Sequence, residues 1–227
     1  MGEIIVASNP KSGVSEAIKT IRTNIQFLGV DNPVKTILVT SPLSGEGKSF
    51  ISSNLAAAYA QSGSKVLLID CDMRCGRQHR IFDLDNERGL SNLLLDNVNK
   101  KFREYIKKTE INNLSVLTMG IVPPNPTELL ESKKCANLFE VLKSSYDIII
   151  LDGIPVLNLT DSLVLAGLAD KIVIVSTYKQ TPMELLKKAI KNLDNYKSKI
   201  AGVVLNKVPS SKSKYNNYYY NKYYTEE

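Results

Sequence analysis

The order of apolar segments in this chain predicts an α/β fold, with a mainly parallel central sheet between two layers of helices. Three short apolar runs, Thr36–Ser41, Lys65–Asp70 and Asp147–Asp152, have the length and composition of buried strands. Helical patterns separate them, and a glycine-bearing loop, Pro42–Gly47, leads from the first run into a helix. A strand, a helix and a parallel strand in this order form a right-handed βαβ unit.

Periodicity and turn residues predict the remaining elements. Apolar residues recur with 4-3-4-3 spacing from Val14 to Leu28, one face of a helix that Ser12 or Ser15 can cap. Gly63 closes the helix after the glycine-bearing loop. The helices that we expect cover 14–28, 48–62, 127–144, 161–168 and 182–196, with a short helix in the loop over 76–95 and a basic helix over 100–108. Further strands are expected over 114–119, 171–176 and 201–206. Residues 1–11 are expected to form an irregular arm, and 122–126 a stiff turn.

Composition excludes several classes of protein. The 227 residues, 43% of them hydrophobic, suit one domain with a substantial core, and no apolar run approaches the roughly 20 residues of a membrane-spanning helix. No secretory signal is apparent, and three cysteines fit a reducing compartment. We therefore expect a cytoplasmic protein. The net charge of +6 comes from scattered lysines without a nucleic-acid-binding motif, so no nucleic acid is expected as a partner.

The segment from Ser41 to Ser49 has the pattern of a phosphate-binding loop. Gly45 and Gly47 allow backbone N–H groups to turn toward an anion at the start of a helix. Lys48 can reach the β- and γ-phosphates, and the Ser49 hydroxyl can bind Mg²⁺. Pro42 stands where the strict pattern has glycine. The sequence therefore predicts a P-loop nucleotide site.

Aspartates end two of the predicted central strands. Asp70 closes one apolar run and Asp152 closes another, and the carboxyl ends of parallel strands meet at the edge that carries the phosphate loop. Carboxylates at this edge can hold Mg²⁺ or its waters, or accept a proton from a hydroxyl.

Tyrosines crowd the carboxyl-terminal end of the chain. No apolar period follows Pro209, so we expect a domain over residues 1–208 and a disordered tail over 209–227. Six of the eleven tyrosines lie in this tail, at Tyr215, Tyr218, Tyr219, Tyr220, Tyr223 and Tyr224.

Together these motifs resemble the bacterial tyrosine kinases (BY-kinases) of capsule and exopolysaccharide synthesis in Gram-positive bacteria. The resemblance covers nearly the whole chain and is carried by SGEGKS at 44–49, LLIDCDMR at 67–74, VPPNPTELL at 122–130, DIIILDGIP at 147–155, GVVLNK at 202–207 and the tyrosine tail. It implies a P-loop NTPase fold and an ATP- and Mg²⁺-dependent tyrosine kinase. Such a kinase autophosphorylates its tail between subunits and regulates polysaccharide synthesis or export.

The resemblance also assigns roles to individual residues. Lys48, Asp70, Asp72 and Asp152 are the expected catalytic residues, and Asp70 is our candidate to accept the tyrosine proton, with Asp72 assisting. Ser49, Asp70 and Asp152 are the expected Mg²⁺ ligands. The expected ATP-binding residues are Ser44, Gly45, Glu46, Gly47, Lys48, Ser49, Phe50 and Asn206.

Assembly and partners are implied in the same way. The stretch EAIKTIRTNIQF resembles the family's ring-forming Glu-x-x-Arg-x-x-Arg helix, with Glu16 and Arg22 matching and Lys19 replacing the first arginine. Gly153 and Ile154 also depart from the family's Asp-Thr-Pro-Pro, leaving every catalytic group in place. The expected partners are further copies of the chain, a membrane adaptor that recruits it to the inner face of the membrane, and a cognate tyrosine phosphatase.

Other interpretations have less support. Cys71, Cys75 and His79 recur every four residues but have no fourth zinc ligand nearby, and the single histidine follows no nucleophile elbow. A positioning ATPase of the partition or division-site type shares the expected fold, but has a signature lysine where this chain has Leu43, and lacks a tyrosine cluster. A nucleotide-binding adaptor whose tail is phosphorylated by another kinase remains an alternative.

Overall fold

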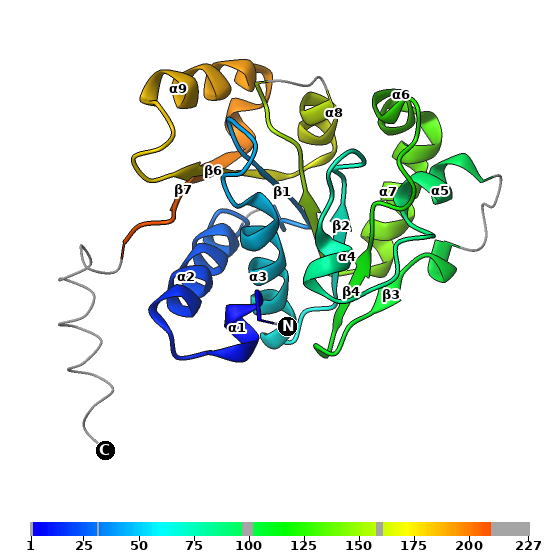
Figure 1. The fold of residues 1–227 in the computed structure, drawn as a ribbon, viewed down its shortest axis with the longest axis horizontal. Helices are drawn as coiled ribbons and strands as arrows, with labels where there is room; N and C mark the ends of the chain where they lie inside the picture. The colour runs from blue at the N-terminus through cyan, green and yellow to red at the C-terminus, as the bar shows by residue number, and fades with distance from the viewer. Residues whose placement is uncertain (1, 31, 97–101, 158–160, 210–227) are drawn as a thin grey trace.

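The computed structural model describes residues 2–30, 32–96, 102–157 and 161–209, and within these ranges one seven-stranded sheet forms the centre of the molecule (Figure 1). Its strand order is β3-β4-β2-β5-β1-β6-β7, and β3 pairs antiparallel to β4 while the other pairs are parallel. The strands are β1 (Thr36–Thr40), β2 (Val66–Asp70), β3 (Lys107–Lys108), β4 (Leu114–Leu117), β5 (Ile148–Asp152), β6 (Lys171–Thr177) and β7 (Ile200–Asn206). The predicted fold class is confirmed.

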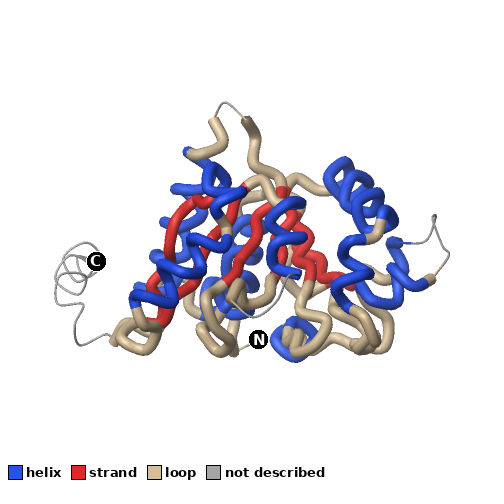
Figure 2. Tube along the Cα trace, turned by 90° about the horizontal axis from the view of Figure 1, so that it is seen from above, coloured by secondary structure: helices blue, strands red, loops and turns tan. Residues whose placement is uncertain are grey.

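Helices cover both faces of this sheet, so that the molecule has three layers (Figure 2). Alternate strand residues enter two separate cores: Ile37 and Val39 of β1 pack toward α1, α2 and α3, whereas Leu38 packs on the other side with α5 to α9. The helices are α1 (Ile5–Ser8), α2 (Gly13–Phe27), α3 (Lys48–Gln61), α4 (Gln78–Ile81), α5 (Leu90–Leu95), α6 (Pro126–Glu131), α7 (Lys133–Ser145), α8 (Asp161–Leu168) and α9 (Met183–Asn192), with 3₁₀ turns η1 (Phe102–Glu104) and η2 (Asp194–Lys199).

The three central strands are buried along their whole length, as their continuous apolar sequences predict. Every residue of β1, β2 and β5 is buried. Strands β2 and β5 are neighbours in register, so that Asp70 lies directly opposite Asp152 at their carboxyl ends. The sheet therefore brings together the two aspartates that the sequence placed at strand ends.

Two expected segments have a different structure because of long-range contacts. The basic helix expected over 100–108 is wrong for its described part: after η1, Lys107 and Lys108 pair with Val116 and Ser115 along the free edge of β4. The arm expected over 1–11 contains α1 instead, held by the N–H of Val6, which donates to Asn54 Oδ1 at 3.1 Å.

Three helices differ from the expected ranges. The single helix expected over 127–144 is divided into α6 and α7, because the Ser132 side chain caps α7 by accepting from the Cys135 N–H. Helix α9 ends at Asn192 and passes into η2 rather than continuing to residue 196. The segment over 76–95 contains α4 in addition to the expected short helix.

The tail predictions cannot be compared with this structure, since residues 210–227, including the six clustered tyrosines, lie outside the described residues. Within the described ranges, no helix combines the length and the apolar character that crossing a membrane requires.

Candidate active site

The loop between β1 and α3 has the shape that its glycines predict. Gly45 and Gly47 adopt φ angles of 78° and 95°, in the left-handed region that favours glycine. A Cβ on Gly47 would also lie 2.1 Å from Asn206 Nδ2. The loop therefore requires glycine at 47 both for its backbone conformation and for its close approach to the end of β7.

Side chains from distant parts of the chain hold this loop in place. Asn206 Nδ2 donates to the Glu46 carbonyl at 2.9 Å, and Lys207 Nζ donates to the Gly45 carbonyl at 2.8 Å. The buried Glu46 carboxylate accepts from the N–H of Leu43 at 2.9 Å and from the Thr181 hydroxyl. Glu46 thus stabilises the loop through its own hydrogen bonds and does not line the cavity beside it.

A cavity of about 560 Å³ opens beside the loop. Seven of the eight residues expected to bind ATP line it, and Glu46 is the exception. Three cationic side chains, Lys48, Arg77 and Lys207, line it together with one carboxylate, Asp72. An excess of positive charge beside a helix N-terminus favours a polyanionic ligand such as a nucleotide phosphate chain. The full lining is Ser44, Gly45, Gly47, Lys48, Ser49, Phe50, Asp72, Cys75, Arg77, Asn206 and Lys207.

Asp70 and Asp152 form a pair of fully buried carboxylates. Burial raises the pKa of Asp70 well above its ordinary value, and the neighbouring Asp152 charge raises it further. Burial also raises the pKa of Asp152, although the hydrogen bond from Gln78, the nearby Ser49 and Ser52 hydroxyls and the Lys48 charge act in the opposite direction. Asp152 Oδ1 is buried and has no hydrogen-bond partner among the described residues. An unpaired carboxylate oxygen at this position is suited to a cation.

The donor set fits magnesium. Two carboxylates and the Ser49 hydroxyl are hard oxygen donors, and magnesium in nucleotide sites commonly takes one or two carboxylates together with phosphate oxygens and water. Within the described ranges, no group of three or more His, Cys, Asp or Glu residues could hold a metal ion by itself. Cys71 is buried whereas Cys75 is exposed, and these cysteines and His79 do not come together as such a group in the described residues.

Asp72 differs from the buried pair because it lines the cavity. Its Oδ1 accepts from the N–H groups of Cys75 at 2.9 Å and Arg74 at 3.2 Å, which fixes the start of the loop after β2. Of the three acidic residues predicted from the sequence, Asp72 is therefore the one that contributes to the cavity wall.

Sequence reasoning missed two groups of residues around this acidic loop. Gln78 is fully buried and contacts both Asp70 and Asp152, and Gly76 packs against Asp70 so closely that a Cβ would lie 2.5 Å from Oδ1. Asp161, also fully buried, binds Arg74 and the Thr127 hydroxyl. These contacts join residues up to 87 positions apart, and no local pattern announces them.

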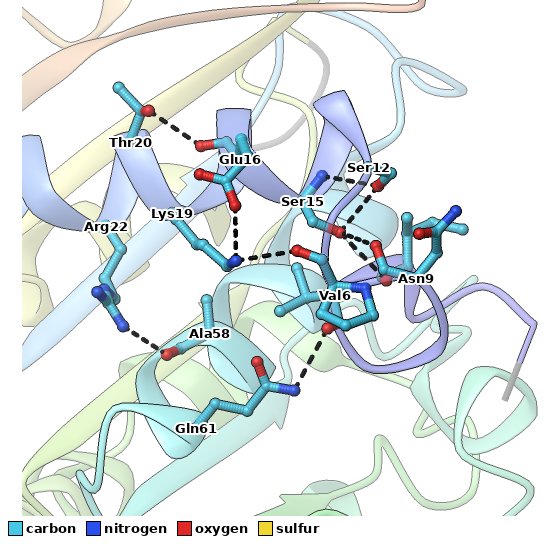
Figure 3. Close-up of polar contacts among 12 residues, drawn as sticks. Val6, Asn9, Ser12, Ser15, Glu16, Lys19, Thr20, Arg22, Ala58 and Gln61 are labelled. Atoms are coloured by element: carbon cyan, nitrogen blue, oxygen red, sulfur yellow. Dashed lines mark hydrogen bonds and ion pairs between the residues drawn. The ribbon is translucent and has the colours of Figure 1, made fainter. Parts of the chain in front are cut away.

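The helix expected to mediate assembly is engaged within its own chain (Figure 3). Lys19 Nζ lies 2.7 Å from Glu16 Oε1 and donates to the Pro10 carbonyl at 2.9 Å. Arg22 points toward α3, where its Nη1 donates to the Ala58 carbonyl at 2.9 Å. All three side chains expected to mediate assembly therefore have partners in the single chain.

Comparison with known proteins identifies the family. Residues 34–205 match the family described as AAA domain. CapB of Staphylococcus aureus is 42% identical over 217 residues, covering 96% of this chain and 94% of that protein. The tyrosine-protein kinase YwqD of Bacillus subtilis is 40% identical, covering 95% of this chain and 90% of its own length.

Solved structures agree with this relationship. The crystal structure of the chimerical protein CapA2B2 is 41% identical with a TM-score of 0.87, covering 92% of this chain and 91% of that chain. The kinase domain of Escherichia coli tyrosine kinase ETK is 31% identical with a TM-score of 0.85, covering 90% and 80%. The septum site-determining protein MinD of Pyrococcus horikoshii, complexed with Mg-ADP, shares the fold alone, at 22% identity and a TM-score of 0.60 over 75% of this chain and 69% of that chain. The chain therefore belongs to the family of bacterial tyrosine-protein kinases.

Proposed function

We propose that this tyrosine-protein kinase binds ATP in the cavity beside Gly45–Ser49 and transfers its γ-phosphoryl group to the tail tyrosines of a second copy of the chain. The observation that carries the proposal is the cavity itself, which combines cationic side chains with the glycine-bearing loop. Ser49 in its lining is joined through the Gln78 amide to Asp152, whose Oδ1 has no partner in the described part of the chain. Phosphoryl transfer depends chiefly on positioning and charge neutralisation, which this arrangement supplies.

In this proposal the P-loop holds the phosphate chain. Backbone N–H groups around Gly45 and Gly47 donate to phosphate oxygens, and Lys48 neutralises charge on the transferring group. Asn206 and Phe50 line the same cavity and are proposed to bound the nucleoside. Ser49, Asp70 and Asp152 are proposed to hold magnesium, which when bound neutralises the phosphate oxygens and orients the nucleotide.

The proton of the attacking tyrosine requires an acceptor, because a phenol with a pKa near 10 is largely protonated at neutral pH. Asp70 is fully buried and accepts hydrogen bonds from the N–H groups of Asp72 and Gln78, whereas Asp72 lines the cavity. We therefore favour Asp72 as the group that meets the tyrosine hydroxyl, with Asp70 orienting the loop and contributing to the magnesium site.

The proposed substrate is the tail, Tyr215 to Tyr224. Full phosphorylation at roughly −1.5 to −2 per phosphate adds about −9 to −12 to the chain, enough to reverse its net charge of +6. Reversal of charge is a means of separating neighbouring subunits, so we propose that phosphorylation lowers the state of assembly.

Regulation of capsular or extracellular polysaccharide synthesis or export is the proposed biological role. Support comes from the similarity of this chain to CapB and to the chimerical protein CapA2B2 over more than nine-tenths of its length. In this proposal the cytoplasmic end of a membrane adaptor recruits and activates the chain at the inner face of the membrane, and a cognate tyrosine phosphatase reverses the reaction.

The decisive experiment incubates the purified chain with ATP and MgCl₂ and follows phosphotyrosine by immunoblot and mass spectrometry. Phosphate on Tyr215 to Tyr224 is expected for the wild-type chain and not for Lys48→Met. Absence of phosphotyrosine from the wild-type chain, even with an adaptor fragment present, would contradict the proposal, and ATP hydrolysis alone would favour a positioning ATPase.

Mixing two full-length variants tests transfer between subunits. One carries Lys48→Met with an intact tail, and the other has phenylalanine at all six tail tyrosines with an intact P-loop. Phosphotyrosine on the Lys48→Met chain in the mixture, and not in that chain alone, is expected for transfer in trans. If the tail is labelled only when a different kinase is added, the chain is a phosphorylated adaptor.

A further inference from the structure

Gln78, the first residue of α4, contacts three elements that meet at the carboxyl edge of the sheet. Its Nε2 lies 2.8 Å from Asp152 Oδ2, at the end of β5, and 3.1 Å from both the Ser49 carbonyl and the Ser52 hydroxyl of α3. Its backbone N–H donates to Asp70 Oδ2 at 2.9 Å, at the end of β2. One fully buried residue therefore connects both carboxylates of the pair to the first turns of the P-loop helix.

The chemistry of these partners fixes the orientation of the amide. The Ser49 carbonyl can only accept hydrogen bonds, as can the Asp152 carboxylate when ionised, so the NH₂ group of Gln78 must face them. The amide oxygen then points elsewhere. Gln78 Oε1 is buried and has no partner among the described residues, and the same is true of Asp152 Oδ1.

These two unpaired acceptors belong to side chains that are hydrogen-bonded to each other. Buried polar atoms are nearly always paired, so two orphaned oxygens on one linked pair indicate a missing donor or cation. The hydrogen bond from Gln78 occupies Asp152 Oδ2 and leaves Oδ1 as the oxygen available to a ligand. A metal-bound water is a donor that the amide oxygen can accept.

The backbone fixes the position of Gln78 as well. The turn from Asp72 to Gln78 wraps around the Asp70 carboxylate, with the Gly76 N–H donating to the Asp72 carbonyl at 2.8 Å. A Cβ at Gly76 would lie 2.5 to 2.7 Å from the Asp70 carboxylate atoms. The close fit of this turn places the Gln78 N–H on Asp70 while the side chain reaches Asp152.

We propose that Gln78 is a positioning residue for magnesium: its amide orients Asp152 so that Oδ1 faces the ion, and its Oε1 accepts from a water of the ion. The inference rests on the proposed function, because it assigns a role at the magnesium site proposed there. Groups that orient a metal ligand in this way commonly change metal affinity by about 10- to 100-fold when they are replaced.

The test measures ADP affinity by isothermal titration calorimetry, with excess MgCl₂ and with EDTA, for the full chain and three variants. Gln78→Met keeps the length of the side chain and the backbone bond to Asp70 but removes the amide. Gln78→Asn keeps the amide and shortens its reach by one methylene, and serves if Gln78→Met does not fold. Gln61→Met is the matched control, because Gln61 lies at the far end of α3. Within the described residues, its side chain makes one hydrogen bond, donated to the Val6 carbonyl at 3.3 Å.

Magnesium is expected to tighten ADP binding to the wild-type chain and to Gln61→Met by the same factor. In Gln78→Met and Gln78→Asn that factor is expected to fall about tenfold, while the affinity measured in EDTA stays within about twofold of the wild type. Binding of Mn²⁺ in the presence of ADP, followed by electron paramagnetic resonance, should weaken by a similar factor.

Three outcomes would overturn the inference. A full magnesium effect in both Gln78 variants would leave Gln78 with a packing role, and an equal loss of ADP affinity with and without magnesium would indicate a distorted P-loop. A wild-type chain that binds ADP without any effect of magnesium would remove the proposed magnesium site together with the role of Gln78. Failure of the kinase proposal is distinguished by the phosphotyrosine assay on the wild-type chain, which does not involve these variants.

Discussion

Strand β5 has an aspartate at each end, and the two are in opposite situations. Asp147, just before the strand, is exposed, and its Oδ2 accepts from the N–H of Lys65 at 2.8 Å. Asp152, at the other end, is fully buried, and its Oδ1 has no partner among the described residues. Burial raises the pKa of Asp152 above its ordinary value. The two aspartates are five positions apart, yet the carboxylate at the amino edge of the sheet binds a backbone N–H, whereas one oxygen of the carboxylate at the carboxyl edge has no partner in the described residues.

Two other aspartates at strand ends differ in burial: Asp170, just before β6, is half-buried, whereas Asp70, at the end of β2, is fully buried. Asp170, at the amino edge, accepts from the N–H groups of Lys35 and Thr36 through one oxygen, at 3.0 and 2.8 Å. Asp70, at the carboxyl edge, is fully buried beside Asp152. Burying two carboxylates side by side lowers the stability of the fold. The Asp70–Asp152 pair at the carboxyl edge therefore indicates a functional role rather than a stabilising one. Aspartates at the amino edge serve as caps for backbone N–H groups.

The largest expected effect comes from removing the cation that faces the buried pair. Lys48→Met takes away the positive charge that lowers the pKa of Asp152 and the group proposed to neutralise the phosphates. Kinase activity, measured as phosphotyrosine formed per minute, is expected to fall by about 100-fold or more. Lys191→Met, on the exposed side of α9, is the control and should leave the rate unchanged. An active Lys48→Met chain would mean that the cavity is not the transfer site.

Asp152→Asn directly tests the role of the carboxylate at the end of β5, one oxygen of which has no partner in the described residues. Activity is expected to fall by roughly 100-fold. The stability of the fold, in contrast, should not fall. The raised pKa means that the folded wild-type chain binds the proton more tightly than the unfolded chain does. Ionising the pair as pH rises above the ordinary aspartate range therefore lowers the stability of the wild type. At about pH 8 without metal, the variant should therefore melt at or above the wild-type temperature in differential scanning calorimetry. A large drop in melting temperature would show that Asp152 stabilises the fold.

Gly76→Ala disturbs the surroundings of Asp70, at the carboxyl edge of the sheet, without changing any charge. The added Cβ would lie 2.5 to 2.7 Å from the Asp70 carboxylate atoms, so the carboxylate or the turn must shift. We expect activity to fall about tenfold and the free energy of unfolding to fall by roughly 1–3 kcal/mol. Gly13→Ala is the control, since a Cβ there meets nothing within 4 Å. Unchanged activity in Gly76→Ala would show that the position of Asp70 is not critical.

The sequence predicted the parts of this edge that depend on local patterns. Continuous apolar runs identified β1, β2 and β5, glycines at 45 and 47 identified the loop, and the rule for parallel strands brought Asp70 next to Asp152. Each signal is contained in a few consecutive residues or follows from the direction of the strands, so tertiary packing did not alter it.

The remaining features depend on partners far away in sequence. Gln78 lies 74 residues from Asp152, and Arg74 lies 87 residues from Asp161, so nothing in either local sequence announces the contact. The pairing of Lys107 with β4 likewise overrides the helical tendency of a lysine-rich segment, because the free edge of β4 supplies hydrogen bonds. The break between α6 and α7 is an exception, because Ser132 is an ordinary N-cap residue.

Arg74→Met separates the effect of burial from that of a missing partner, because Asp161 is buried but both of its carboxylate oxygens have partners. Arg74 and the Thr127 hydroxyl both bind the Asp161 carboxylate, so burial by itself does not leave a carboxylate oxygen without a partner. Removing Arg74 leaves that carboxylate with the Thr127 hydroxyl, and we expect the free energy of unfolding in urea to fall by roughly 3 kcal/mol. Activity should change only a few-fold if Asp72 keeps its place. The double variant Arg74→Met with Asp161→Asn should recover part of the stability, and failure to do so would argue against the ion pair.

Asp147→Asn carries the smallest expected effect and is the control for the whole comparison. The asparagine carbonyl oxygen can still accept from the Lys65 N–H, and the site is exposed, so the variant loses only the charge on that acceptor. We expect the free energy of unfolding to change by at most about 0.5 kcal/mol, and phosphotyrosine formation to stay within about twofold of the wild type. If Asp147→Asn instead lowered activity as far as Asp152→Asn does, the two ends of β5 would be equivalent. That result would contradict the placement of the active site at the carboxyl edge of the sheet.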